Sequence, residues 1–270
     1  MPRLRRNGEG AEVIMAVHPS GTVTLAGREL FLGGQAELLA HIESLLPAQS
    51  VHTVITPNVD QALNLVDDAR LRRAYDEAEI RITDGFPLVK LGHLLGGSRL
   101  ERHTGADLLP LVAAQARRLG WRIAVTGGEE HIARIAAETL RRRFDADVVA
   151  VPFPRITSVE DDGSRKVVDE LVQLKPDLVF VCLGSPKQDV WVSHWRSELP
   201  PALYVGAGAA VDFVAGTKKR APATIQRLGA EWIYRLVQEP RRLARRYLIR
   251  GPRFVYIALR SLLLAKESAR

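Results

Sequence analysis

Residues 178–189 read LVFVCLGSPKQD, and this stretch predicts the fold of the chain. It begins with a run of apolar residues whose length is typical of a buried strand. Gly184 ends the run, and Ser185 and Pro186 are residue types that favour the N-cap and the first position of a helix. A strand that turns directly into a helix is the repeating unit of parallel sheets covered by helices.

The same alternation of strands and helices continues in both directions along the chain. The predicted strands are residues 51–56, 79–83, 121–126, 147–151, 177–183 and 202–206. The predicted helices are residues 59–75, 87–95, 106–119, 129–143, 165–174 and 186–197. This rhythm predicts an α/β fold, with a Rossmann-like, mostly parallel sheet and helices on both of its faces.

We predict three regions along the chain. Residues 1–50 form an N-terminal region of strands that packs on the core, with a hairpin of residues 13–17 and 21–25. Residues 51–225 form the Rossmann-like core, and residues 226–270 form a basic, amphipathic helical appendage.

The net charge of +7 comes from the C-terminal end of the chain. Residues 241–270 hold nine Lys or Arg against one Glu, so the totals of 38 basic and 31 acidic residues leave 29 and 30 for residues 1–240. Such a tail predicts an anionic partner: a membrane surface, a pyrophosphate or a nucleic acid. Apolar side chains between the arginines, such as Phe254 and Ile257, are predicted to enter the headgroup boundary of a membrane.

The sequence favours a cytoplasmic location. Residues 1–6 are basic but no apolar stretch follows them, so we expect no secretory signal. The longest apolar candidate, residues 254–265, is too short to span a membrane and contains Arg260. Cys182 is the only cysteine, and its place in an apolar run predicts a buried structural thiol.

Glycines and polar residues follow the predicted strands, where ligands bind in parallel α/β sheets. Among them, Asp84 ends a strand and precedes Gly85. An Asp-Gly pair is common in turns, and a carboxylate at this edge of a sheet is also placed to act as a general base. Lys187 and Gln188 open the helix after Gly184 and would add a charge and a hydrogen-bonding amide beside the helix N–H groups.

Two other motifs are weak. Residues 206–208 read GAG and lack the third glycine of a dinucleotide fingerprint, which argues against an oxidoreductase. Asp145 and Asp147 are similar to an Asp-x-Asp metal motif, but they are predicted at the opposite edge of the sheet. The histidines show no metal-ligand spacing. We therefore predict no metal site.

The ordered motifs of the chain resemble the WecG/TagA/CpsF family of bacterial glycosyltransferases from about residue 51 to residue 247. The matching stretches are Thr56-Pro57-Asn58, Thr83-Asp84-Gly85, residues 102–107 (RHTGAD), Gly127-Gly128, residues 184–189 (GSPKQD), Gly206-Ala207-Gly208 with Asp212, Arg220-Ala221-Pro222, Glu231-Trp232 with Arg235-Leu236, and Glu239-Pro240 with Arg242. One departure is Asp189, where the family usually has glutamate.

The resemblance implies a Rossmann-like catalytic core and an inverting, metal-independent hexosyltransferase that needs no cofactor. Its expected donor is a UDP-sugar that carries a hexose or an N-acetylhexosamine-type sugar. The expected acceptor is a polyprenyl-diphosphate-linked sugar in the synthesis of an exopolysaccharide or another surface polysaccharide. The enzyme would be cytoplasmic and peripherally attached to the anionic inner face of the cell membrane, with no nucleic-acid partner. A homo-oligomer is compatible with this interpretation.

The resemblance also assigns roles to particular residues. Asp84 matches the catalytic base. Substrate binding falls to pocket residues and to appendage arginines that share one predicted helical face: Thr56, Asn58, Arg102, Gln188, Arg235, Arg242 and Arg245. Nucleotide binding falls to residues after the strands: Gly127, Gly128, Gly184, Lys187, Gly206, Gly208 and Asp212. The alternative is a membrane- or nucleic-acid-binding adaptor that uses the basic tail, which does not explain why polar motifs gather at the strand ends.

Overall fold

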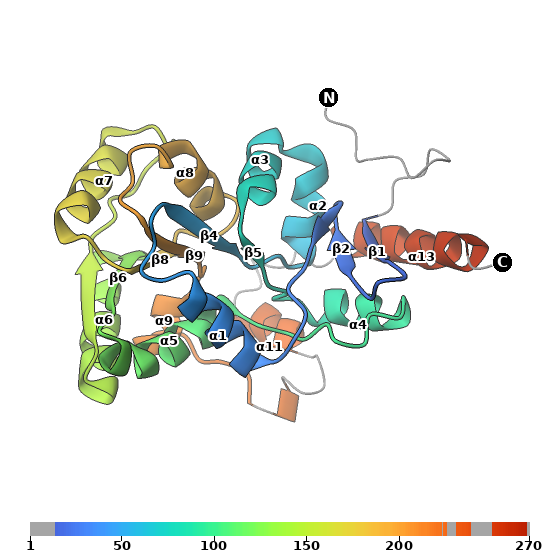
Figure 1. Cartoon of the computed structure of the whole chain (residues 1–270), viewed down its shortest axis with the longest axis horizontal. Coiled ribbons are helices and arrows are strands. Elements are labelled where there is room, and N and C mark those ends of the chain that lie inside the picture. The colour runs from blue at the N-terminus through green and yellow to red at the C-terminus, as the bar shows by residue number, and fades with distance from the viewer. Residues whose placement is uncertain (1–13, 223, 226–230, 239–249, 269–270) are drawn as a thin grey trace.

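The computed structural model describes residues 14–222, 224–225, 231–238 and 250–268. Its centre is a six-stranded sheet whose neighbouring strands are all parallel, in the order β5-β4-β9-β8-β6-β7 (Figure 1). The strands are β4 (Val51–Ile55), β5 (Ile80–Arg81), β6 (Arg122–Gly127), β7 (Asp147–Val151), β8 (Leu178–Cys182) and β9 (Ala202–Gly206). Each lies on a predicted strand, so the predicted α/β class with a parallel sheet is confirmed.

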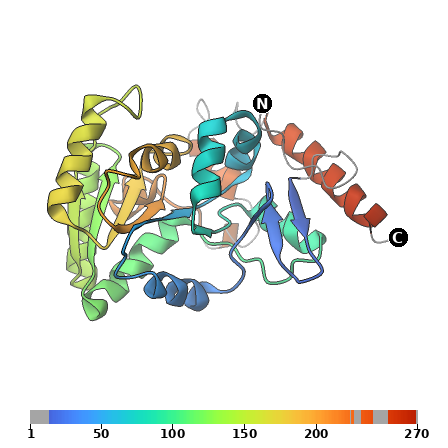
Figure 2. The same cartoon turned by 45° about the horizontal axis from the view of Figure 1, so that its top comes forward.

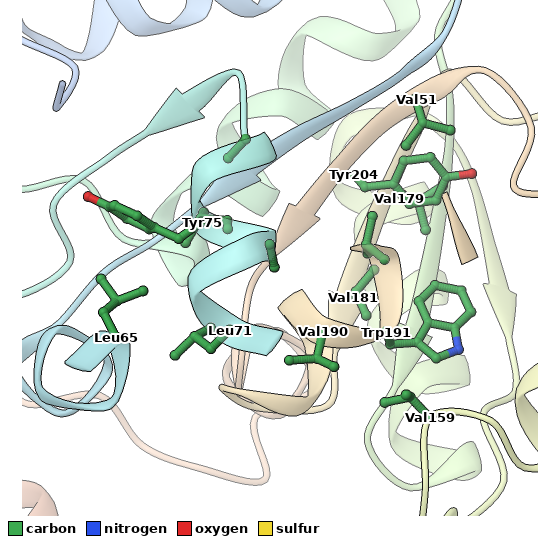
Figure 3. Packing of buried hydrophobic residues seen from close by; sticks show 14 of the residues in the cluster. Val51, Leu65, Leu71, Tyr75, Val159, Val179, Val181, Val190, Trp191 and Tyr204 are labelled. Atoms are coloured by element: carbon green, nitrogen blue, oxygen red, sulfur yellow. The ribbon is translucent and has the colours of Figure 1, made fainter. Parts of the chain in front are cut away.

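Helices cover both faces of this sheet, as predicted. Alternate strand residues point to opposite faces, so Tyr204 and Val205 of β9 belong to two separate apolar clusters. The helices on one face are α2 (Val59–Asp67), α3 (Ala69–Glu77), α7 (Asp162–Leu174) and α8 (Lys187–Trp195). Those on the other face are α1 (Gln35–Ser44), α5 (Gly105–Leu119), α6 (Glu130–Phe144) and α9 (Ala210–Val214). Figure 3 shows the first cluster, in which Trp191 of α8 and Tyr75 of α3 lie beside the strands.

The chain forms two helices where the sequence predicts one over residues 59–75. The side chain of Asp68 accepts hydrogen bonds from the backbone N–H groups of Arg70 (2.9 Å) and Leu71 (3.1 Å). This local cap offers the backbone an alternative to a continuous helix, and α3 begins there instead of continuing α2.

The N-terminal region is a three-stranded antiparallel sheet of β1 (Met15–Val17), β2 (Val23–Leu25) and β3 (Arg28–Glu29). The hydroxyl of Tyr75 on α3 donates to the carbonyl of Leu25 at 3.1 Å and ties this sheet to the core. Helix α1 follows the sheet and is not among the predicted elements. Helix α4 (Phe86–Leu94) packs against β1.

The C-terminal helices are α11 (Glu231–Gln238) and α13 (Gly251–Ser268). Helix α13 packs against β1 and α2 (Figure 2). Phe254 is only 7% exposed and Ile257 packs against the same cluster, so the expectation that these two side chains enter a membrane is wrong. The outward face of α13 carries other large apolar residues: Val255, Tyr256, Leu259 and Leu263. Within the described ranges, no helix combines the length and apolarity needed to cross a bilayer.

Candidate active site

A cleft of about 300 Å³ lies at the carboxyl ends of β4, β8 and β9, the edge where parallel sheets bind ligands. Side chains and backbone that follow β5 and β9 complete its wall. Seven of the predicted site residues line it: Thr56, Asn58, Asp84, Gly184, Gln188, Gly208 and Asp212. The topology therefore brings together residues from four separate stretches of the chain.

Asp84 is half-buried at the rim of the cleft. Its backbone N–H donates to the carbonyl of Pro57 at 2.9 Å, which joins the chain after β5 to the chain after β4. A Cβ on Gly85 would lie 3.4 Å from the Cα of Asn58, so the missing side chain lets the two segments approach. This close approach sets the Asp84 carboxylate beside the residues that follow β4.

Thr56 and Asn58 both make hydrogen bonds that shape the cleft. The buried Thr56 hydroxyl donates to the Gly206 carbonyl at 2.9 Å and joins the ends of β4 and β9. The side-chain oxygen of Asn58 caps α2 by accepting from the backbone N–H groups of Asp60 (3.1 Å) and Gln61 (3.2 Å). Helix α2 thus begins directly at the cleft.

Gln188 lines the cleft from the first turn of α8, and its side chain is buried. Its Oε1 accepts from the backbone N–H of Gly208 at 3.0 Å. Gly206 does not line the cleft, but a Cβ there would lie 2.6 Å from Nε2 of Gln188. The absence of a side chain on Gly206, the last residue of β9, therefore makes room for the Gln188 carboxamide.

Two cations that the sequence does not predict as site residues line the cleft, Lys218 and Arg220. Arg220 makes a two-pronged ion pair with Asp107, with Nη2 to Oδ2 at 3.2 Å. Burial opposes the charge, but the hydrogen bond and charge of Asp107 raise the pKa of Arg220. The Nζ of Lys218 lies 3.5 Å from Oδ2 of Asp212. In the sequence, the only signal for Arg220 is the motif Arg220-Ala221-Pro222.

Carboxylates outnumber cations in the described lining of the cleft. The acidic residues are Asp60, Asp84, Asp212 and Glu231, against Lys218 and Arg220. Neighbouring arginines outside the lining pair with two of the acids: Arg102 donates to Glu231 at 2.9 Å, and Arg250 contacts Asp60. An anionic ligand would need further positive charge.

Several predicted site residues lie outside the cleft lining. Lys187 turns away, because its Nζ donates to the carbonyl of Ile156 at 3.2 Å. Arg102 reaches the cleft through Glu231. A Cβ on Gly127 would lie 2.6 Å from the carbonyl carbon of Cys182, and Gly128 has a φ of 75°, so these glycines serve the turn after β6.

The remaining predicted positions fall elsewhere or outside the description. Arg235 belongs to helix α11. Arg242 and Arg245 lie outside the described residues. Asp145 and Asp147 stand at the amino end of β7, opposite the cleft, and pair with Arg117 and Arg122. Among the described residues, no group of three or more His, Cys, Asp or Glu side chains is placed to hold a metal ion.

A comparison with protein-family models finds a match to the glycosyl transferase WecG/TagA/CpsF family over residues 23–268. The match begins at β2 and ends with α13, so it covers the cleft, most of the N-terminal sheet and both C-terminal helices. It therefore extends beyond residues 51–247, on which the sequence resemblance rests.

Proposed function

The chain belongs to the WecG/TagA/CpsF glycosyl transferase family, and we propose that it transfers sugar from a UDP-sugar to a polyprenyl-diphosphate-linked sugar with inversion at the anomeric carbon. Membership makes it a glycosyltransferase with a role in polysaccharide biosynthesis. The transferred group is a hexose or an N-acetylhexosamine-type sugar. The observation that carries the proposal is the convergence of Asp84, Thr56, Asn58 and Gln188 on one cleft.

In the proposed mechanism, Asp84 is the general base. Its carboxylate takes the proton of the acceptor hydroxyl while that oxygen attacks the anomeric carbon and the bond to UDP breaks. The half-buried position of Asp84 at the cleft rim suits this role, because a base must reach the acceptor and remain ionised. The side-chain amide of Gln188, which lines the cleft, is the proposed donor for a hydroxyl or phosphate oxygen of the donor substrate.

The leaving UDP gains negative charge, which must be stabilised in a cleft whose described lining is rich in carboxylates. We propose that appendage arginines supply this charge without a metal ion: Arg235, Arg242 and Arg245. Arginine suits the task because its planar guanidinium stays charged and binds phosphate oxygens in pairs.

The described residues on either side of this stretch contact the cleft, which supports the proposed role of its arginines. Before it, Glu231 lines the cleft and accepts from Arg102 at 2.9 Å. After it, Arg250 contacts Asp60, which also lines the cleft. The chain between these two residues therefore starts and ends beside the proposed diphosphate site.

The test is a transfer assay with purified protein, a soluble diphosphate-linked acceptor analogue and a panel of donors. UDP-glucose, UDP-N-acetylmannosamine and its uronic acid are compared by UDP release. With the best donor, Asp84→Asn should lower kcat by about 10²–10⁴-fold while donor binding survives. Asp169→Asn, an exposed change on α7, is the control and should leave the rate unchanged. An Asp84→Asn enzyme with the wild-type rate would exclude Asp84 as the base.

Metal dependence is a separate prediction. If guanidinium groups stabilise the leaving group, transfer should continue in excess EDTA at the rate seen without it. Loss of activity in EDTA, with recovery on adding Mg²⁺ or Mn²⁺ but not Ca²⁺, would contradict the metal-independent mechanism.

A further inference from the structure

Asp189 lies beneath the floor of the cleft, is 4% exposed and does not line the cleft itself. Its Oδ2 accepts a hydrogen bond from Nε2 of Gln61 at 2.8 Å. The side chains of Ser185 and Gln188 are also near enough to this carboxyl group to lower its pKa. These three partners come from α2, from the turn after β8 and from α8, and all three line the cleft.

The packing around Asp189 leaves its partners little freedom. A Cβ on Gly206 would lie 2.7 Å from Oδ1 of Asp189 and 2.6 Å from Nε2 of Gln188. Oε1 of Gln188 is held by the N–H of Gly208 at 3.0 Å, and its Nε2 lies beside Asp189 over Gly206. Gln61 is 1% exposed, and its Oε1 has no hydrogen-bond partner among the described residues.

The chemistry of a carboxylate decides which way both carboxamides face. An ionised carboxylate only accepts hydrogen bonds, so each amide must turn its NH₂ group toward Asp189 and its oxygen away. A neutral amide or acid in this position would accept from one partner and donate to another, which permits either orientation.

We propose that Asp189 is a positioning residue for donor binding, which holds Gln61, Ser185 and Gln188 in the one arrangement that accepts the UDP-sugar. This inference rests on the proposed function of the same cleft. Asp189 acts through its three partners and does not touch the substrate. Its removal should therefore weaken the binding of the donor more than it slows the chemical step.

The charge of Asp189 responds to pH near neutrality. Burial raises the pKa of its carboxyl to about 7, although Ser185, Gln188 and the backbone N–H of Asp189 itself oppose the rise. None of the ion pairs among the described residues includes Asp189: on α2, Asp60 pairs with Arg250, and on α8 Lys187 donates to a backbone carbonyl. The carboxylate form, which fixes both amides, is therefore lost as the pH falls below 7.

The test compares kcat and donor KM from pH 5.5 to 8.5 for the wild type, Asp189→Asn and Asp189→Glu, with Asp169→Asn as the control. At pH 8, Asp189→Asn should raise the donor KM about tenfold or more, with a smaller change in kcat. The wild-type KM should rise below pH 7, and Asp189→Asn should lose this dependence. Asp189→Glu keeps the carboxylate and should restore part of the affinity. A wild-type KM and pH profile in Asp189→Asn would overturn the inference.

A second readout does not depend on the donor. The side-chain amide NMR resonances of Gln61 and Gln188 should shift with a midpoint near pH 7 in the wild type and stay constant in Asp189→Asn. Resonances that ignore pH in the folded wild type would overturn the inference. A wild type that titrates in this way but transfers from no UDP-sugar would instead contradict the proposed function, so the two failures are distinguishable.

Discussion

At the scale of single residues, the raised pKa of Asp189 predicts how stability changes with pH. Between the usual aspartate range near pH 4 and its folded value of about 7, the folded state keeps a proton that the unfolded chain has released. Stability therefore falls as the pH rises through this window, by up to about 1.4 kcal/mol per pH unit. We expect urea unfolding at pH 5, 6, 7 and 8 to show that the free energy of unfolding of the wild type falls relative to that of Asp189→Asn as the pH rises to 7. If the free energies of unfolding of the two proteins change equally with pH, this prediction is contradicted.

Gly105 gives a second prediction at this scale, because it permits a close contact between α5 and the cleft. A Cβ there would lie 2.6 Å from the Cα of Ala207, a backbone atom that cannot move independently. Gly105→Ala should lower the free energy of unfolding by about 1–3 kcal/mol and distort the cleft at Ala207. Gly251→Ala is the control, since nothing lies within 4 Å of its Cβ. Equal melting temperatures for the two variants would exclude this role for Gly105.

The sequence predicts the site residues that directly follow strands and misses those that need three-dimensional contacts. Thr56, Asp84 and Gly208 stand where parallel strands end, so a reading of strand ends finds them. Gln61 lies inside a helix pattern and Arg220 in an irregular segment, and only the folded chain brings them to the cleft. Lys187 shows the limit of the same reading: its backbone stands at a strand end, but its side chain bonds to the Ile156 carbonyl and does not line the cleft.

At the scale of elements, periodicity predicts where strands and helices are but not their order in the sheet. The strand runs are nearly continuous in apolar residues, which is typical of strands buried on both faces. The pairing of β4 with β9, about 150 residues later, depends on tertiary contacts that no local pattern contains. Helix α1 was missed since its apolar face is short, with Leu38 and Ile42 as its buried residues.

Two arginines attach the C-terminal segment to α2, Arg253 of α13 and Arg250 directly before it, and we predict different effects for them. Arg253 contacts Asp67 at 2.7 Å through largely exposed side chains, so Arg253→Ala should cost less than about 1 kcal/mol. Arg250 contacts Asp60 and Asn64 through less exposed groups, and Asp60 lines the cleft. Arg250→Ala should therefore lower kcat/KM with the soluble acceptor, whereas Arg253→Ala should not. Steady-state kinetics on both variants test this prediction. Equal losses of kcat/KM in the two variants would contradict a particular role for Arg250.

At the scale of the whole molecule, the outward face of α13 is the proposed contact with an anionic membrane. Leu259 and Leu263 are 56% and 63% exposed, and Arg260 lies exposed between them. Apolar side chains can enter the headgroup boundary, and each nearby basic residue adds about 1 kcal/mol of attraction. The Leu259→Glu and Leu263→Glu double variant should lose binding to vesicles with anionic lipids in a flotation assay.

Two controls distinguish a loss of membrane binding from a loss of folding: a matched variant on another helix, and the transfer rate on a soluble acceptor. Because Phe254 is buried, deletion of the whole helix would expose the core, and point changes on the outward face are the cleaner test. Val172→Glu, a change at an exposed apolar residue on α7, should leave vesicle binding intact. The double variant should keep its rate on a soluble acceptor. Unchanged flotation of the double variant would exclude this face as the membrane contact.

The position of β9 between β4 and β8 determines when a growing chain can become an enzyme. Synthesis proceeds from the N-terminus, so β4 and β8 leave the ribosome before β9 can pair with both. Until Gly206 is made, each of these strands has an unpaired edge, and such edges bind other chains. A nascent chain that stalls between β8 and β9 is therefore expected to be a client for chaperones and proteases, with no partial transferase activity.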